Sequence, residues 1–204
     1  MSTILYIAAS PRGAESHSRR FGDMVLQRLR ARRPEARIVT RDLSADPLPV
    51  PDAAFSAAIL APPVANHPDL AGSEALIREL EAADEVVIAT PMHNYSVPAV
   101  LKAWVDQIVR IHRTFASTPA GKVGLLPDRP VYLVVASGGW FTQATPTGAP
   151  PQPDFLTPYL RAVLATIGLR TLTVLTLEGV TRGPEAAAVA WAKATAVLDA
   201  ALPE

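Results

Sequence analysis

One stretch of this chain places a short apolar segment, a polar loop and an amphipathic segment next to each other. Residues 85–89 form a compact run with three β-branched side chains, which is typical of a strand covered on both faces. Residues 99–110 have apolar side chains at helical spacing, and Pro98 suits a first helical turn because the amide hydrogen it lacks would be unpaired there. We therefore expect the loop at 90–98 at the carboxyl end of a buried strand, which is where open α/β sheets bind their ligands.

The same alternation of strands and helices runs through the rest of the chain. Apolar or alternating runs predict four further strands, at 4–9, 36–43, 129–136 and 171–177. Helical spacing predicts five further helices, at 19–33, 52–60, 73–81, 154–168 and 184–202, with Ser73 as the cap of the third. This pattern is typical of a parallel sheet with right-handed crossovers and helices on both faces. We expect an α/β fold with a five-stranded parallel sheet in the order 2-1-3-4-5, while periodicity alone also permits 3-2-1-4-5.

Three segments have weaker patterns. The strand at 36–43 carries polar residues that suit the edge of the sheet rather than its centre. Residues 44–72 are rich in Pro and Ala, and only the helix at 52–60 is expected there. Residues 142–153 contain four prolines, which predict an irregular excursion.

The charge of the chain is balanced, with 19 Lys and Arg residues against 19 Asp and Glu residues among 204. This balance argues against a nucleic acid or an anionic membrane as the main partner. The length predicts one domain spanning residues 1–204, and 49% hydrophobic residues suit a well-covered core. No apolar run is long enough to span a membrane and no signal-peptide pattern precedes the first strand, so we expect a cytoplasmic location.

The numbers and positions of cysteine and histidine residues limit the metal sites and nucleophiles that the chain can form. The chain has no cysteine, which excludes disulfides, thiolate nucleophiles and thiolate metal sites. The four histidines, His17, His67, His93 and His112, are too scattered to predict a metal site.

The loop after the first strand is the first candidate binding site. Ser10, Ser16 and Ser18 offer hydroxyl donors, and the loop leads into the amino end of a helix, whose free amides and dipole favour an anion. The loop lacks the patterns GxGxxG and GxxxxGK(S/T), so a monophosphate fits it better than a dinucleotide or the phosphates of a P-loop. The alternative is that Ser16 or Ser18 only caps the helix, and the spacing does not separate the two interpretations.

The second candidate is the loop that contains Pro91, Met92, His93, Asn94 and Tyr95. A flat aromatic ligand lying across the sheet edge could receive hydrogen bonds from the loop amides and from Asn94, while Met92 and Tyr95 pack against it. Alternatively, Asn94 closes a turn and Tyr95 belongs to the core. His93 is a candidate general acid, and its alternative role is that of an exposed or packed side chain without a partner.

The third candidate is the run Ser137, Gly138, Gly139 and Trp140, which follows the strand at 129–136. Paired glycines permit positive φ and a close approach of the backbone to a ligand, or they serve a tight turn. Ser137 does not lie in a G-x-S-x-G pattern, so it is not expected to be a hydrolase nucleophile.

Together these loops resemble those of the FMN-dependent NADH:quinone oxidoreductase and azoreductase family. The similarity spans nearly the whole chain. Its marks are Ser10 with Ser16-His17-Ser18, Arg41-Asp42-Leu43, 91–98 followed by 101–106, Arg113-Thr114-Phe115, 136–139, 156–160, and Glu178-Gly179 with 183–185. An ordered series of matches is far more specific than any single motif.

The resemblance implies a flavodoxin-like fold that binds FMN and no metal. By matching position, Ser10, Ser16, His17 and Ser18 would hold the phosphate, while 91–95 and 137–140 would frame the flavin ring. NADH or NADPH would donate a hydride, and a quinone or azo compound would then accept two electrons in a ping-pong mechanism. The catalytic candidates are Asn94, His93 and the amides of Tyr95 and Gly139. Family members commonly have an aromatic residue at the position of His93 and often a charged one at that of Gly138.

The resemblance also implies a homodimer with the flavin at the subunit interface. The apolar candidates for that contact are Trp104, Ile108, Ile111, Phe115 and Tyr159, although burial between helix and sheet would explain each of them equally. Two alternative functions stay open. One is an electron carrier of the flavodoxin type, or a flavin-binding protein, that reduces no substrate of its own. The other is a binding protein without flavin.

Overall fold

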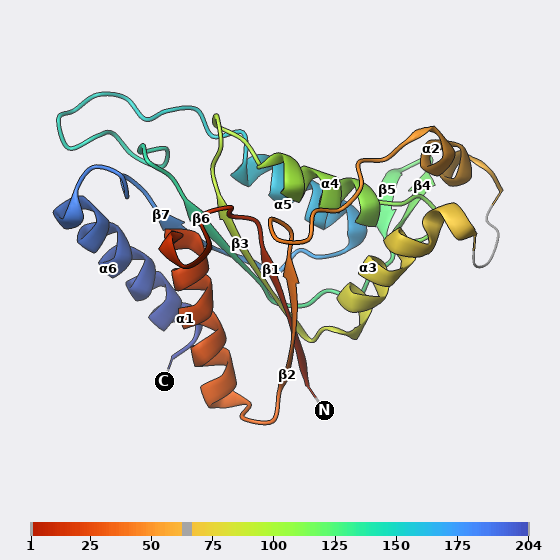
Figure 1. Ribbon diagram of the computed structural model, residues 1–204, viewed down its shortest axis with the longest axis horizontal. Helices are drawn as coiled ribbons and strands as arrows, with labels where there is room; N and C mark the ends of the chain where they lie inside the picture. The colour runs from red at the N-terminus through yellow and green to blue at the C-terminus, as the bar shows by residue number, and fades with distance from the viewer. Residues whose placement is uncertain (1, 63–66, 204) are drawn as a thin grey trace.

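The computed structural model describes residues 2–62 and 67–203, and its centre is a five-stranded parallel sheet. The strands are β1 (Thr3–Ala8), β2 (Arg37–Asp42), β3 (Glu85–Pro91), β6 (Val131–Ala136) and β7 (Leu172–Leu177). They lie in the order β2-β1-β3-β6-β7, and every neighbouring pair is parallel (Figure 1). The predicted α/β class and the predicted edge position of β2 are confirmed. The predicted order 2-1-3-4-5 differs from the observed one in its last two strands, which are β6 and β7.

The difference in numbering comes from two short strands that no sequence pattern predicts. β4 (Phe115–Thr118) and β5 (Gly121–Gly124) form a separate antiparallel hairpin. Each strand has four residues, and their sequences, FAST and GKVG, lack the apolar alternation by which strands are recognised. The hairpin therefore depends on its neighbours: β5 packs against α5 (Thr157–Ile167), and the amide of Leu126 donates to the carbonyl of Ile167 at 3.0 Å.

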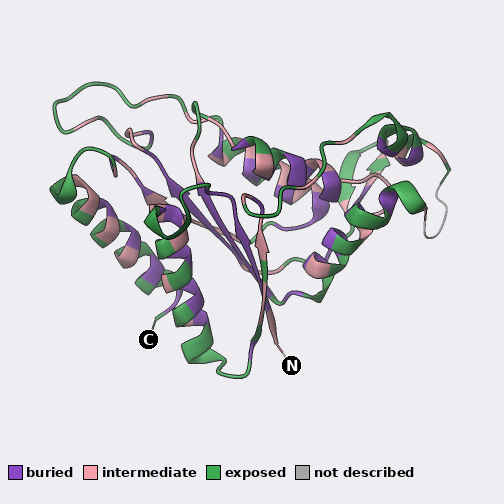
Figure 2. Ribbon diagram, viewed as in Figure 1, coloured by how far each residue is buried: buried purple, intermediate pink, exposed green. Residues whose placement is uncertain are grey.

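Helices cover both faces of the sheet, as predicted (Figures 1 and 2). One face carries α1 (His17–Arg32) and α6 (Pro184–Ala201). The other face carries α3 (Ala71–Ala82), α4 (Ala99–Ile108) and α5. Because side chains alternate along a strand, Leu5 and Ile7 face the second group of helices while Ile4 and Tyr6 face the first. Both faces of the sheet are therefore covered by helices, which explains the nearly continuous apolar runs in its strands.

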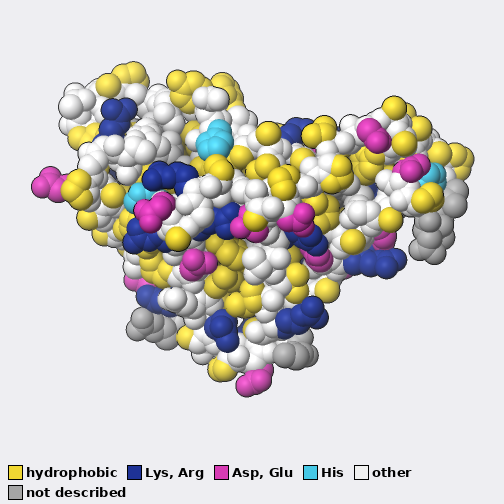
Figure 3. Space-filling view, viewed as in Figure 1, with side chains coloured by type: hydrophobic (Ala, Val, Ile, Leu, Met, Phe, Trp, Pro, Cys, Tyr) yellow, Lys and Arg dark blue, Asp and Glu magenta, His cyan; other side chains and the backbone are white. Residues whose placement is uncertain are grey.

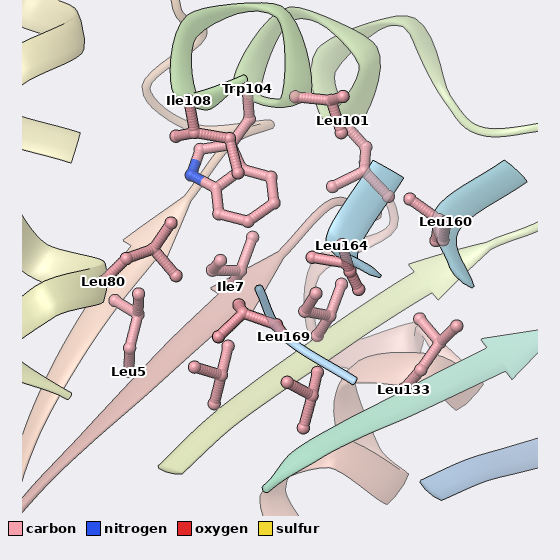
Figure 4. Close-up of a cluster of buried hydrophobic side chains, with 14 of the residues drawn as sticks. Leu5, Ile7, Leu80, Leu101, Trp104, Ile108, Leu133, Leu160, Leu164 and Leu169 are labelled. Atoms are coloured by element: carbon pink, nitrogen blue, oxygen red, sulfur yellow. The ribbon is translucent and has the colours of Figure 1, made fainter. Parts of the chain in front are cut away.

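Trp104 shows how one of these layers is packed. Its side chain is 0% exposed and lies between α4 and the sheet, beside Ile108 and Ile7 (Figure 4). Truncation of such a side chain to alanine typically costs about 3–5 kcal/mol. Trp104 and Ile108 are buried between helix and sheet, so the helix-on-sheet interpretation holds for them. Phe115 is buried in the hairpin of β4 and β5, so none of the three is available to a partner.

Several boundaries differ from the predicted ones for local reasons. α3 begins at Ala71, and Ser73 does not cap it, since its buried hydroxyl donates to the carbonyl of Gln107. α5 begins at Thr157 rather than 154, because the Asp154 carboxylate accepts the amides of Leu156 and Thr157 at 2.9 and 2.8 Å and caps the helix from outside.

The regions with weak patterns follow the prediction only in part, since a 3₁₀ turn and the start of α3 also lie within 44–72. α2 (Ala53–Leu60) forms with Asp52 as its cap, and a 3₁₀ turn follows at Pro68–Leu70. The part of 44–72 that comprises residues 63–66 lies outside the described residues. Residues 142–153 contain neither helix nor strand, as expected of their prolines.

Candidate functional site

The three predicted loops begin at one edge of the sheet, because β1, β3 and β6 are adjacent and parallel (Figure 1). The amide of Ala9 donates to the carbonyl of Ala89 at 2.9 Å, which joins the ends of β1 and β3. The amide of Met92 donates to the carbonyl of Ala136 at 2.8 Å, which joins the ends of β3 and β6. The loops therefore share the carboxyl edge at which α/β sheets bind ligands.

In the first loop, Ser10, Ser16 and Ser18 are 2%, 3% and 0% exposed. Ser16 is the N-cap of α1, since its Oγ accepts the amide of Arg19 at 3.3 Å, so the capping interpretation holds for this residue. Its Oγ also lies 3.0 Å from the Oγ of Ser18. The hydrogen bond between these two hydroxyls uses only one of their two hydrogens. The other O–H remains for an anion at the amino end of α1, so capping and binding are compatible.

Arg19 and Asp42 fix this loop to the neighbouring strand. The Arg19 guanidinium donates to the carbonyl of Ser10 through Nε and Nη2 at 3.0 and 2.8 Å. It also donates to both carboxylate oxygens of Asp42, at the end of β2, at 2.6 and 2.5 Å. This hydrogen-bonded pairing holds the pKa of the Asp42 carboxyl below its usual value. Sequence reasoning missed Arg19 and used Asp42 only as a family mark, although an acidic residue directly after a strand at this edge was a usable signal.

The second loop is a tight turn. His93 and Ser96 exchange two backbone hydrogen bonds of 2.9 Å, and the two residues between them, Asn94 and Tyr95, have φ values of 48° and 70°. Asn94 thus closes a turn, which is the alternative interpretation given for it above. A tyrosine in the left-handed region costs about 1–2 kcal/mol, and the amide of Phe155, which donates to the Tyr95 carbonyl at 2.9 Å, helps to hold it there.

The side chains of this turn point outward. Tyr95 is 47% exposed, so it does not belong to the core, and His93 and Asn94 are exposed as well. Within residues 2–62 and 67–203, neither the His93 ring nor the Asn94 carboxamide has a hydrogen-bond partner, and the Tyr95 amide has none either. Donors are therefore available at this edge, but His93 lacks the partner that would orient a general acid.

The third loop does not use its glycines for positive φ, since neither Gly138 nor Gly139 adopts it. They permit close contact with the chain itself: a Cβ on Gly138 would lie 2.7 Å from Oγ1 of Thr181, and one on Gly139 would lie 2.2 Å from Oε1 of Gln152. The amide of Gly139 donates to the Oγ of Ser137 at 3.2 Å, so it is already engaged. Of the predicted ring-edge donors, the Asn94 carboxamide and the Tyr95 amide remain.

Gln152 joins the second and third loops, although nothing in the sequence around it indicates such a role. Its Nε2 donates to the Oγ of Ser137 at 3.0 Å and lies 3.3 Å from the sulfur of Met92. Its amide donates to the carbonyl of Trp140 at 2.8 Å. The irregular segment at 142–153 thus places the Gln152 side chain between the second and third loops.

Trp140 and Glu178 complete the edge next to β7. The Glu178 carboxylate accepts the amides of Phe141 and Thr142 at 2.5 and 2.7 Å, which fixes the chain after the glycines. A Cβ on Gly179 would lie 2.7 Å from the Trp140 ring, so this glycine permits the ring to pack against the backbone. Trp140 is half-buried in this arrangement.

Of two cavities, one adjoins the third loop and the other lies away from the three loops. One of about 580 Å³ lies between Trp140, Glu178 and Lys193 on α6. The other, of about 480 Å³, lies between α2, α3 and residues 110–113. At the candidate edge the side chains of His93, Asn94 and Tyr95 are exposed, so the edge is open to solvent there. Acidic and basic side chains are interspersed over the face seen in Figure 3, in keeping with the balanced charge of the sequence.

Fold and loops together define a class: a doubly wound α/β protein with a serine-rich loop at its first strand–helix junction and two further loops at the same edge. The family model described as a flavodoxin-like fold matches residues 2–202. An FMN-dependent NADH:quinone oxidoreductase from Pseudomonas fluorescens is 49% identical over 186 residues, covering 91% of this chain and 88% of that protein. Another, from Cupriavidus pinatubonensis, is 47% identical over 189 residues, covering 91% and 90%. The chain belongs to the family of FMN-dependent NADH:quinone oxidoreductases.

Solved structures show the same fold. An azoreductase from Bacillus anthracis superposes with a TM-score of 0.80 at 23% identity, covering 99% of this chain and 97% of that one. An FMN-dependent NADH-azoreductase from the same organism, solved in complex with FMN, gives 0.80 at 22% identity, covering 99% and 100%. No described helix combines the length and apolar composition that a membrane crossing requires. Among the described residues, no group of three or more His, Asp or Glu side chains could hold a metal ion.

Proposed function

We propose that this protein is an enzyme that uses FMN and NADH to reduce quinones and azo compounds. The observation that carries the proposal is the serine loop at the amino end of α1, placed at the same sheet edge as the turn at 93–96 and the loop at 137–140. The names of relatives at 47–49% identity support the same cofactor and reductant. Use of NADPH in place of NADH stays a prediction.

The residues of the first loop fit the phosphate of FMN. The site would combine the free O–H of the Ser16 and Ser18 pair, the O–H of Ser10 and the unpaired amides of the first turn of α1. Arg19 would not touch the phosphate, since its guanidinium is used by Asp42 and by the Ser10 carbonyl; it holds the loop in place. A doubly charged phosphate gains most from such donors when they are fixed before it binds.

The turn at 93–96 would lie along the edge of the flavin ring. When bound, FMN would supply the two-electron hydride chemistry that links NADH to the acceptor, and we propose a ping-pong order. The Asn94 carboxamide and the Tyr95 amide are the available donors that would stabilise negative charge developing on the ring. Met92 and Tyr95 offer it apolar contact. The exposed His93 ring has no hydrogen-bond partner among the described residues that would orient it as a proton donor, so water is the proposed source of protons.

We also propose a homodimer whose partner covers the open edge. Its support is the pair Tyr95 and Phe155, which are adjacent through a backbone hydrogen bond and are 47% and 63% exposed. Exposed aromatic side chains beside an open ligand edge are typical of an interface. The half-buried Ile111 and Tyr159 stay candidates for the same contact. The single domain at 1–204 and the cytoplasmic location stay predictions.

Anaerobic mixing of the FMN-loaded protein with NADH, followed by a quinone, tests the function. We expect NADH to bleach the flavin absorbance and the quinone to restore it, with one quinone reduced for each NADH oxidised. A flavin that binds but is bleached by neither NADH nor NADPH would show an electron carrier instead. A protein that takes up no FMN would show that the flavin interpretation is wrong.

A further inference from the structure

Trp191 on α6 contacts the first turns of α1 in three ways. Its Nε1 lies 3.2 Å from the Nδ1 of His17, the first residue of α1. Its ring meets the Phe21 ring edge-on at a centroid distance of 5.2 Å, and the Arg20 guanidinium lies 5.2 Å from its centre. Residues 17, 20 and 21 share one face of the helix, because they are three and four positions apart. One aromatic side chain from α6 is therefore held by three neighbours on α1.

The hydrogen bond to His17 has only one possible direction. The indole nitrogen is a donor and never an acceptor, so the Nδ1 of His17 must accept and carries no proton. A neutral imidazole that is unprotonated at Nδ1 is protonated at Nε2. An imidazolium ring would carry a proton on both nitrogens and would lose the bond to Trp191. The contact therefore selects one protonation state and one tautomer of His17.

The surroundings of His17 favour the same state. Burial lowers the pKa of the His17 ring, and the positive charges of Arg20 and Arg12 lower it further. These two arginines, from α1 and from the loop, are the charged groups that shift the pKa of the ring, and the residue of α6 that contacts it is the neutral Trp191. In the described part of the chain, the Nε2 of His17 has no hydrogen-bond partner and is not buried, so its N–H is available to a ligand.

We propose that Trp191 is a positioning residue for the phosphate site: its indole N–H fixes His17, which lies between Ser16 and Ser18 in the chain, as the Nε2–H tautomer and thereby provides one neutral N–H donor. This role rests on the proposed function, in which Ser10, Ser16, His17 and Ser18 hold the phosphate of FMN. Trp191 itself touches neither the phosphate nor the ring. A neutral donor fixed in one tautomer would keep this part of phosphate affinity constant across neutral pH.

The variant Trp191→Phe tests the proposal, since it keeps an aromatic ring against Phe21 and Arg20 but removes the N–H. Long-range proton–nitrogen NMR of the flavin-free protein reads the His17 tautomer, with His17→Gln to assign the signal. We expect only the Nε2–H form in the natural protein. In Trp191→Phe we expect a mixture of tautomers and a higher His17 pKa, because the neutral form loses a hydrogen bond.

Binding titrations with FMN and with riboflavin, which lacks the phosphate, give the second readout. FMN affinity should fall about two- to tenfold in Trp191→Phe, the effect of about one hydrogen bond, while riboflavin affinity stays unchanged. The packing control is Trp191→Leu, which should also lower the unfolding temperature.

An Nδ1–H tautomer in the natural protein, or an unchanged tautomer and an unchanged FMN-to-riboflavin ratio in Trp191→Phe, would overturn the role of Trp191 alone. Failure of the natural protein to bind FMN would overturn the proposed function and this role with it.

Discussion

At the amino ends of the strands, carboxylates accept backbone amides of the neighbouring strand. The carboxyl ends also have engaged carboxylates, Asp42 and Glu178, but they present in addition polar groups without a partner in the described part of the chain. Asp128, before β6, accepts the amides of Arg170 and Thr171 at 2.7 and 3.1 Å and so joins the starts of β6 and β7. Asp84, before β3, accepts the amide of Thr3 at 2.7 Å and joins β3 to β1. These acidic groups have partners within the chain and are not available to a ligand.

At the carboxyl edge, several hydrogen-bonding groups lack a partner. Here one O–H of the Ser16 and Ser18 pair, the Asn94 carboxamide and the Tyr95 amide have no partner in the described part of the chain. Tyr95 also occupies a costly backbone conformation that the other end of the sheet does not require. We therefore expect the amino end of the sheet to contribute mainly stability and the carboxyl end to contribute ligand binding as well. Substitutions at the two ends should therefore affect different measurements.

The largest expected effect is on phosphate binding at the carboxyl edge. The double variant Ser10→Ala/Ser18→Ala should lower FMN affinity about 100-fold, since each hydrogen bond to a charged phosphate contributes roughly tenfold or more. Riboflavin affinity should not change. Fluorescence titration with both flavins measures the difference, and Ser117→Ala, at an exposed position of β4, is the control. Equal losses for FMN and riboflavin would place the phosphate elsewhere.

The opposite result is expected at the amino edge. Asp128→Ala removes the acceptor of the Arg170 and Thr171 amides and should lower the free energy of unfolding by about 1 kcal/mol, a value that allows for solvent screening at this exposed site. FMN affinity should stay unchanged. Urea unfolding monitored by circular dichroism gives the stability. A loss of FMN affinity without a loss of stability would contradict the separation between the two ends.

Asp128 also makes the free energy of unfolding depend on pH, and the direction of this dependence follows from its pKa. Burial alone would raise the pKa of Asp128, but hydrogen bonds from Arg170, Thr171 and Arg129 hold it at about 2. In the unfolded chain an aspartate titrates near about 3.9. The charged form therefore stabilises the fold fully above about pH 4, and this contribution is lost as the pH falls toward 2. The stability difference between the natural protein and Asp128→Asn should shrink over that interval.

Sequence reasoning predicted the parallel sheet because burial on both faces leaves a strong apolar signal in β1, β3 and β6. It located the three loops for the same reason, since each follows one of those strands. It missed β4 and β5, which depend on contacts with α5 rather than on their own residues. It also missed Gln152 and Trp191, which reach the site from distant segments; such contacts are set by tertiary packing and leave no local pattern.

A smaller effect is expected at Asn94, where backbone and side chain can be separated. Asn94→Gly tolerates φ 48° but lacks the carboxamide, whereas Asn94→Ala lacks the carboxamide and strains the turn. Both variants should slow flavin reduction by NADH about three- to tenfold, the effect of about one donor. Only Asn94→Ala should lose about 1 kcal/mol of stability. If stopped-flow reduction is slow in Asn94→Ala and normal in Asn94→Gly, the turn matters and the carboxamide does not.

The smallest effect is expected at His93, whose ring is exposed and has no partner among the described residues. His93→Phe introduces the kind of residue that the family commonly has there, and His93→Gln removes the ionisable ring while keeping a polar side chain. Stability should change by less than about 0.5 kcal/mol in either variant, as at other surface positions. If water supplies the protons, the pH profile of quinone reduction should also be unchanged between pH 5.5 and 8. A profile that changes in the same way in both variants would identify His93 as the proton donor, and the carboxyl edge would then contribute acid catalysis as well as binding.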